Sequence, residues 1–290
     1  MLRFGRFTIF AATAVAVVGV SAGSAAAHPI AASSAPRPVI HGTGGLRPDI
    51  RLPRDGRAAV NAQGIPIQYS GNWSGYIALP KSGKATSFRY VQADYTVPSV
   101  NCGVTPNAFS YDWVGLDGDS DSTVEQDGVS GYCVGGSASY FGWYEMYPAG
   151  VQVEFYLNAG DAINSSVYYN SSTHVYTLSL TDITSGQTFS VNTTCAATCN
   201  NSSAEVITEG YPSGSYDGTS DFGMVHYDTI WVTDSAGHRG ELTDTNWNTD
   251  ESISRDPSDV VDTEPGALYA ASVPSSPLLS AFDDQWYNED

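Results

Sequence analysis

The sequence predicts an all-β protein in which two antiparallel sheets pack face to face as a β-sandwich. From Ser70 onward, bulky apolar residues alternate with polar ones, and no apolar stripe with the 3.6-residue period of a helix stands out. The chain also holds 18 Tyr and 29 Gly, a composition that suits many short strands joined by turns. Strands of this density over residues 68–290 are typical of two packed sheets.

The expected strands can be placed individually. Residues 87–97 carry a large apolar side chain at every second position, and residues 151–157 show the same alternation. Residues 175–181 and 188–191 flank the tripeptide Ser-Gly-Gln at 185–187, which predicts a hairpin. A length of 290 residues allows one large domain or two small ones.

The formal charge of −19 is distributed unevenly along the chain. Residues 1–67 carry seven Arg and two Asp, a net charge of +5, which leaves −24 for residues 68–290. Nucleic acids and anionic membrane surfaces are bound by clustered Lys and Arg, so this acidic body indicates neither as a partner. A hydrophobic content of 41% argues against a disordered acidic chain.

The basic head is expected to be separate from the folded body. Arg3 and Arg6, the apolar stretch 7–20 and the Ala run at 25–27 predict a signal peptide over residues 1–27, and therefore a secreted protein. Residues 28–67 are rich in Pro, Gly, Ala and Arg. They fit either a disordered linker or a basic propeptide whose Arg residues dock on the acidic body, and the opposed charges favour the propeptide.

Four cysteines indicate disulfides rather than a metal site, because an even number in a secreted chain is typical of disulfide bonding. Cys195 and Cys199 have no His nearby, and Cys102 and Cys133 are far apart in sequence. We expect the pairs Cys102–Cys133 and Cys195–Cys199 rather than crossed pairings, and we expect neither a metal nor a cofactor.

Several common catalytic motifs are missing. The sequence contains no His-Glu-x-x-His, no Gly-x-Ser-x-Gly, and no Asp-Thr-Gly or Asp-Ser-Gly. The acidic run 117–121 suggests a calcium loop, but Ser122 and Gly128 stand where an EF-hand needs Gly and Glu. We therefore expect a solvated acidic turn there.

A series of segments, taken together, resembles the glutamic peptidases, or eqolisins. The segments, in chain order, are Asn-Trp-Ser-Gly-Tyr (72–76), Tyr-Thr-Val-Pro (95–98), Trp-Val-Gly-Leu-Asp-Gly-Asp (113–119), Val-Glu-Gln-Asp-Gly (124–128), Trp-Tyr-Glu-Met-Tyr-Pro (143–148), Ala-Glu-Val-Ile-Thr-Glu (204–209) and Asp-Phe-Gly (221–223). The resemblance implies a sandwich of two long antiparallel sheets, of the concanavalin A-like or jelly-roll type. It also implies a peptidase.

The resemblance implies a catalytic pair formed by Gln126 and Glu209. Glu205 fills the other acidic position of its segment and lies about 13 Å from Glu209 along a strand, too far to share a proton with it. Amide hydrolysis needs a base for water, a donor to the oxyanion and an acid for the leaving nitrogen. Glu209 can be base and then acid, and the Gln126 amide can be the donor.

Further site residues follow from the same resemblance. Trp113, Asp117, Trp143 and Glu145 match positions that line the cleft or hold the catalytic pair, although both Trp residues could simply belong to the core. The chain also departs from the family pattern. Asp121 replaces a Cys that in the family is bonded to one near the catalytic Glu segment, and Val206 replaces a Trp.

These observations predict a secreted, acid-acting endopeptidase. Its partners would be polypeptide substrates and its own propeptide, with no nucleic acid and no membrane, and we expect a monomer. The alternative is a carbohydrate-binding or glycan-hydrolysing β-sandwich, in which Glu145 or Glu125 would supply the second carboxyl beside Glu209.

Overall fold

Strands make up all the regular structure that the computed structural model describes. It covers residues 46–195, 197–210, 218–256, 260–272 and 279–287, and these contain eighteen strands and no helix that could cross a membrane. The chain divides into two units, Met1–Pro36 and Arg37–Asp290, and every described residue belongs to the second. The expected signal peptide, residues 1–27, lies outside the described residues.

One sheet carries the candidate site. Its strands, in spatial order, are β8 (Gln152–Leu157), β7 (Ser137–Tyr147), β6 (Val124–Val134), β5 (Phe109–Leu116), β12 (Ala204–Gly210), β3 (Trp73–Leu79), β15 (Asn248–Arg255), β2 (Ile67–Ser70) and β1 (Arg51–Leu52). All neighbours in this sheet are antiparallel except β2 and β15, which are parallel. Strand β12 lies in the middle, paired on both edges.

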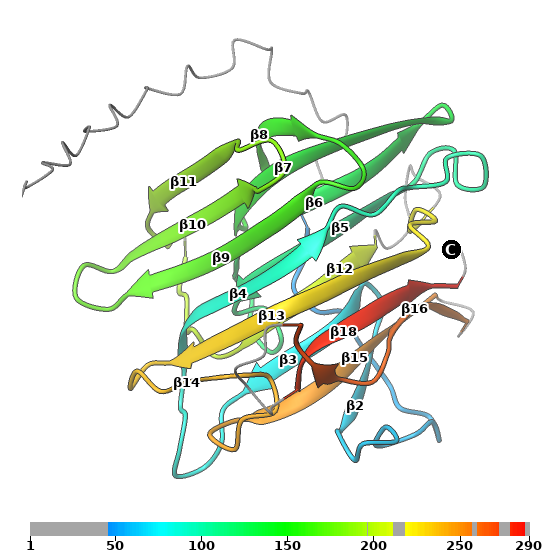
Figure 1. Ribbon diagram of the computed structural model, residues 1–290. Coiled ribbons are helices and arrows are strands. Elements are labelled where there is room, and N and C mark those ends of the chain that lie inside the picture. The colour runs from blue at the N-terminus through cyan, green and yellow to red at the C-terminus, as the bar shows by residue number, and fades with distance from the viewer. Residues whose placement is uncertain (1–45, 196, 211–217, 257–259, 273–278, 288–290) are drawn as a thin grey trace, which may run out of the picture. The chain divides into compact units, whose positions relative to one another are not determined.

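The second sheet packs against the first (Figure 1). Its strands, in spatial order, are β11 (Thr188–Thr193), β10 (Val175–Asp182), β9 (Ala162–Asn170), β4 (Phe88–Thr96), β13 (Met224–Asp234) and β18 (Leu279–Trp286). Short strands β14 (Arg239–Gly240) and β17 (Tyr269–Ala270) pair with β13 and β18. Strand β16 (Val261–Pro265) pairs with β15 and β18 and so joins the two sheets at one edge.

The predicted fold class is confirmed, and so are the strands that the sequence indicated most clearly. The expected strand over 87–97 is β4, the one over 151–157 is β8, and the expected hairpin is the antiparallel pair β10–β11. Both expected disulfides, Cys102–Cys133 and Cys195–Cys199, are present.

The main core lies between the sheets. It contains Val114, Val206 and Tyr76 from the first sheet and Val91 and Val232 from the second, each fully buried. Because side chains alternate along a strand, the neighbours of these residues on the first sheet point to its outer face. The period-two pattern of the sequence therefore separates a packing face from a face that is free to carry a site.

A polar cluster also crosses this core, beneath strand β12. The Thr208 hydroxyl donates to Asp112 Oδ1 over 3.0 Å, and the Tyr227 hydroxyl of the second sheet donates to the same oxygen over 3.3 Å. Ser74, the register partner of Thr208, donates to Asp284 Oδ1 over 2.8 Å. Burial raises the pKa of Asp112 to about 7 and that of Asp284 to about 8.

These buried carboxyls predict a fold that is most stable in acid. A carboxyl with a raised folded-state pKa stabilises the fold fully below its unfolded pKa, and that stabilisation is lost as the pH rises through the folded value. Each such group contributes up to about 1.4 kcal/mol per pH unit between the two values. We therefore expect the midpoint of thermal unfolding to fall from about pH 4 to about pH 8.

The variant Asp112→Asn should flatten this dependence, because an amide oxygen can still accept from Thr208 and Tyr227 but does not titrate. The matched control is Glu264→Gln, at a half-buried position of β16. Thermal unfolding followed by circular dichroism across this range is the measurement. A wild-type midpoint that rises with pH would contradict the role given to the buried carboxyls.

Candidate active site

Strand register brings the sequence-predicted residues onto one face of the first sheet. Gln126 on β6 is the direct partner of Glu145 on β7 and of Gly115 on β5, and Gly115 is in turn the partner of Glu205 on β12. Glu209 lies four residues beyond Glu205 on the same strand, so its side chain shares this face. This is the outer face, opposite the main core.

Glu145 holds the amide of Gln126. The Gln126 Nε2 group donates to Glu145 Oε2 over 2.7 Å, and both side chains are fully buried. Burial raises the pKa of Glu145 to about 9; the charge of Glu209 raises it further, and the Gln126 bond opposes the change. Glu145 therefore holds Gln126 directly, and its carboxyl shares the outer sheet face with that of Glu209, whose charge acts on it.

Asn72, between β2 and β3, holds Glu209. Its Nδ2 group donates to Glu209 Oε1 over 3.1 Å, and its own Oδ1 accepts from the Ser70 hydroxyl over 3.1 Å. Burial raises the pKa of Glu209 to about 8, and hydrogen bonds from the Arg47 N–H and from Asn72 oppose this rise, as do the indoles of Trp73 and Trp113.

Aromatic side chains form the wall around these polar groups. The rings of Trp73 and Trp113 meet edge to face with centroids 5.0 Å apart, and those of Tyr111 and Trp143 do so at 5.5 Å. A Cβ on Gly115 would lie 2.7 Å from the Trp113 ring, so glycine leaves the space that this indole occupies beside Gln126. Trp113 and Trp143 are both completely buried.

Asp117 does not contact Gln126 or Glu209, and its carboxylate instead binds the loop before β12. Its carboxylate accepts from the backbone N–H groups of Asn200 over 2.9 Å, Asn201 over 2.8 Å and Ser202 over 2.5 Å. These residues lead directly into β12, so Asp117 fixes the entry of the strand that carries Glu209. The expected solvated acidic turn at 117–121 is wrong: Asp117 is fully buried, because its oxygens satisfy these backbone groups.

Asp121 connects the same two segments. Its Oδ2 atom accepts from the Ser202 hydroxyl over 2.9 Å and from Asn200 Nδ2 over 3.2 Å. Asp121 stands where the resemblance to the glutamic peptidases implies a Cys that is disulfide-bonded to a second Cys near residues 204–209. In this chain hydrogen bonds therefore connect the turn to the loop before β12.

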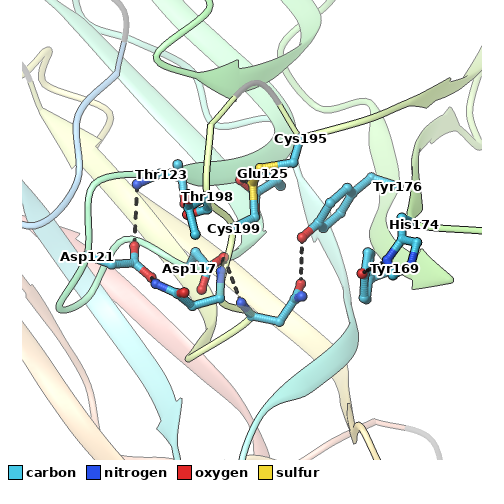
Figure 2. Close-up of a disulfide and its surroundings, with 12 residues drawn as sticks. Asp117, Asp121, Thr123, Glu125, Tyr169, His174, Tyr176, Cys195, Thr198 and Cys199 are labelled. Atoms are coloured by element: carbon cyan, nitrogen blue, oxygen red, sulfur yellow. Dashed lines mark hydrogen bonds between the residues drawn. A yellow bond between two sulfur atoms is a disulfide. The ribbon is translucent and has the colours of Figure 1, made fainter. Parts of the chain in front are cut away.

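The Cys195–Cys199 disulfide covers Glu125, which points away from Gln126. Cys199 Sγ lies 2.9 Å from Glu125 Oε1, and burial raises the pKa of Glu125 to about 10 (Figure 2). Within the described ranges, the one group of potential metal ligands is Glu125 with these two cysteines. Both sulfurs are committed to the disulfide, so the group does not fit a metal ion.

Comparison with known proteins identifies the family. A model of the peptidase A4 family matches residues 71–262. The chain belongs to this family, the eqolisins. It is therefore a peptide-bond hydrolase, and the resemblance seen in the sequence is confirmed. No curated protein sequence matches the chain.

Solved structures of eqolisins share the fold. Scytalido-glutamic peptidase bound to a transition-state analogue inhibitor is 22% identical, with a TM-score of 0.61 over 75% of this chain and 98% of that one. SCP-B, an eqolisin in complex with the tripeptide Ala-Ile-His, is 22% identical, with a TM-score of 0.57 over the same shares. Aspergilloglutamic peptidase from Aspergillus niger is 22% identical, with a TM-score of 0.51 over 62% and 99%.

Sequence reasoning missed the role of Asn72. In the sequence, Asn72 is simply the first residue of the segment 72–76 and carries no sign of its partner. Its contact with Glu209 joins positions 137 residues apart. The adjacent Trp73 aligns directly with Glu209 across β3 and β12. A polar residue next to that Trp was the available signal.

Replacing Asn72 should change the proton affinity of Glu209. Asn72→Ala removes a donor to the carboxylate, so the pKa of Glu209 rises. The acid limb of the kcat/KM profile against pH should then move upward by about one unit. Asn164→Ala is the matched control, because that amide donates to Asp94 in the other sheet. An unchanged acid limb would show that Asn72 does not position Glu209.

Replacing Glu145 should lower kcat while leaving KM nearly unchanged, because the Gln126 amide loses the acceptor that orients it. We expect a loss of about tenfold or more for Glu145→Ala, since small misplacements of a catalytic group are costly. Glu145→Gln keeps an oxygen that can accept from Gln126 and should retain most activity. Steady-state kinetics on a peptide substrate compare the two; equal losses would reject the orienting role.

Proposed function

We propose that the chain is a secreted, acid-acting endopeptidase in which Gln126 and Glu209 hydrolyse the peptide bond with a Glu209-activated water. The observation that carries the proposal is the arrangement on one sheet face. Asn72 binds Glu209 and Glu145 binds Gln126, and register places the side chains of Gln126, Glu145 and Glu209 on the same face. A carboxyl and an oriented amide are the two functional groups that this chemistry needs.

The roles follow from the donors and acceptors. The ionised Glu209 takes a proton from water as the water oxygen attacks the peptide carbon. The second N–H of the Gln126 amide, the one that does not bind Glu145, donates to the oxyanion that forms. Protonated Glu209 then returns the proton to the leaving nitrogen, which breaks the C–N bond and restores the carboxylate.

Secretion and an acidic working range are supported by the sequence together with the core. The basic, apolar and Ala-rich pattern of residues 1–27 fits a signal peptide, and two disulfides suit an oxidising compartment. The charge of −24 on residues 68–290 is self-repelling near neutrality and falls as carboxyls protonate. Polypeptide substrates and a monomeric state complete the proposal.

Two substitutions test the catalytic pair. Gln126→Ala should lower kcat by about 100-fold or more, since it removes an oxyanion donor. Glu209→Gln should abolish hydrolysis, because an amide cannot carry the proton. Glu205→Gln, on the same strand and face, is the matched control and should remain active.

The assay is peptide release from acid-denatured casein at about pH 4, a range in which ordinary carboxyls titrate. Circular dichroism confirms that each variant is folded. Full hydrolysis by folded Glu209→Gln, or its loss in Glu205→Gln, would reject the assignment. Glycan binding without peptide release would instead support the carbohydrate alternative, which family membership disfavours.

A further inference from the structure

The segment that precedes the family match lies against the proposed catalytic carboxylate. Leu46 and Arg47 begin the described part of the chain, whereas the family match starts at residue 71. The Arg47 backbone N–H donates to Glu209 Oε1 over 3.0 Å. With this contact in place Glu209 is only 1% exposed, so bulk water does not reach its carboxylate.

Main-chain groups make most of the contacts of this segment. The Arg47 carbonyl accepts from Trp73 Nε1 over 3.0 Å and from Asn72 Nδ2 over 3.2 Å. The Ile50 N–H donates to Asn72 Oδ1 over 2.9 Å, and the Ile50 carbonyl accepts from the Gly71 N–H over 2.8 Å. Every peptide presents such groups, so these contacts are of a kind that a substrate backbone could also make.

The side chains of the segment add selectivity. Leu46 is 2% exposed and belongs to the apolar cluster on the outer sheet face, together with Trp73, Tyr111 and Trp113. At the other end of the segment, Arg51 Nη2 forms an ion pair with Asp119 Oδ1 at 2.6 Å. Arg51 also lines a cavity of about 790 Å³, together with Asp119 and Asp250.

We propose that residues 46–51 form an inhibitory strap that occupies the peptide-binding cleft of the unprocessed chain, with Leu46 in a subsite for a large aliphatic side chain. The inference rests on the proposed function, because it takes Glu209 as the catalytic base. It also names a substrate class: peptides with a large aliphatic residue on the N-terminal side of the amide that contacts Glu209.

The strap would disable Glu209 in two ways. Its N–H occupies the oxygen that would otherwise meet water or substrate. It also leaves Glu209 only 1% exposed, so bulk water does not reach the carboxylate to be activated. Removing the strap would return water to this carboxylate.

Binding of the strap through its main chain can be distinguished from electrostatic docking of its Arg side chains. Arg47 contacts Glu209 through its main chain, so Arg47→Ala keeps the contact and removes the positive charge. Arg47→Pro removes the N–H as well as the charge. If charge alone holds the head of the chain, both variants should behave alike.

The experiment measures initial rates of hydrolysis of a fluorogenic peptide by the full chain, with intact mass checked before and after the assay. We expect intact Arg47→Pro to be about tenfold or more faster than the intact wild-type chain, and Arg47→Ala to stay close to wild type. If Arg47→Pro does not fold, Leu46→Gly replaces it, since that change empties the subsite and should release the strap.

The Leu46 subsite is tested with a peptide of residues 45–51, Gly-Leu-Arg-Pro-Asp-Ile-Arg. The peptide is added to Arg47→Pro, or to Leu46→Gly where that variant replaces it. The peptide should inhibit competitively, and the same peptide with Gly in place of Leu should bind about tenfold more weakly or worse. Three results would overturn the inference. The intact wild-type chain could be as fast as Arg47→Pro, or Arg47→Ala could be as fast as Arg47→Pro. The third is equal inhibition by the two peptides. A complete lack of hydrolysis by every chain, processed or not, would instead count against the proposed function.

Discussion

The alternation of side chains along β12 is the constraint on which the site depends. This strand lies between β3 and β5, so both of its edges are fixed by hydrogen bonds and its register cannot slip without turning every side chain over. Thr208 therefore points inward to Asp112 and Tyr227, and its neighbour Glu209 points outward to Asn72. The polar cluster in the core and the candidate active site are thus two faces of one strand.

Burial of carboxyls connects fold and function in this chain. Asp112 and Asp284 in the core, Glu145 and Glu209 in the site, and Glu125 beside the disulfide all have raised pKa values, and in each case desolvation is the largest cause. A fold with so many acids in dry surroundings is most stable where these acids are neutral. Glu209 is the exception in the proposed mechanism, because it must ionise to take a proton from water.

The sequence was sufficient for features that depend on local pattern. Alternation of apolar and polar residues predicted β4 and β8, and the turn at 185–187 predicted the β10–β11 hairpin. The number and positions of the cysteines predicted both disulfides. The contacts of Asn72 and Arg47 with Glu209 escaped prediction, because they join residues 137 and 162 positions apart through loops with no periodic pattern. Asp117 was misplaced for a related reason: an acidic run usually indicates solvent, and only the folded chain shows that backbone N–H groups surround it.

The two-residue strand β1 has a kinetic consequence. It pairs with β2, and residues 53–66 connect the two strands. Most of these residues are exposed to solvent, so a short exposed connection links the strap to the body. Such a link gives a bound segment an effective concentration in the millimolar range, at which weak main-chain contacts suffice to keep the cleft filled. A single cut in that connection would turn the strap into a separate molecule that is lost by dilution. Activation would then be set by how readily an exposed loop is cleaved, and not by how tightly the strap binds.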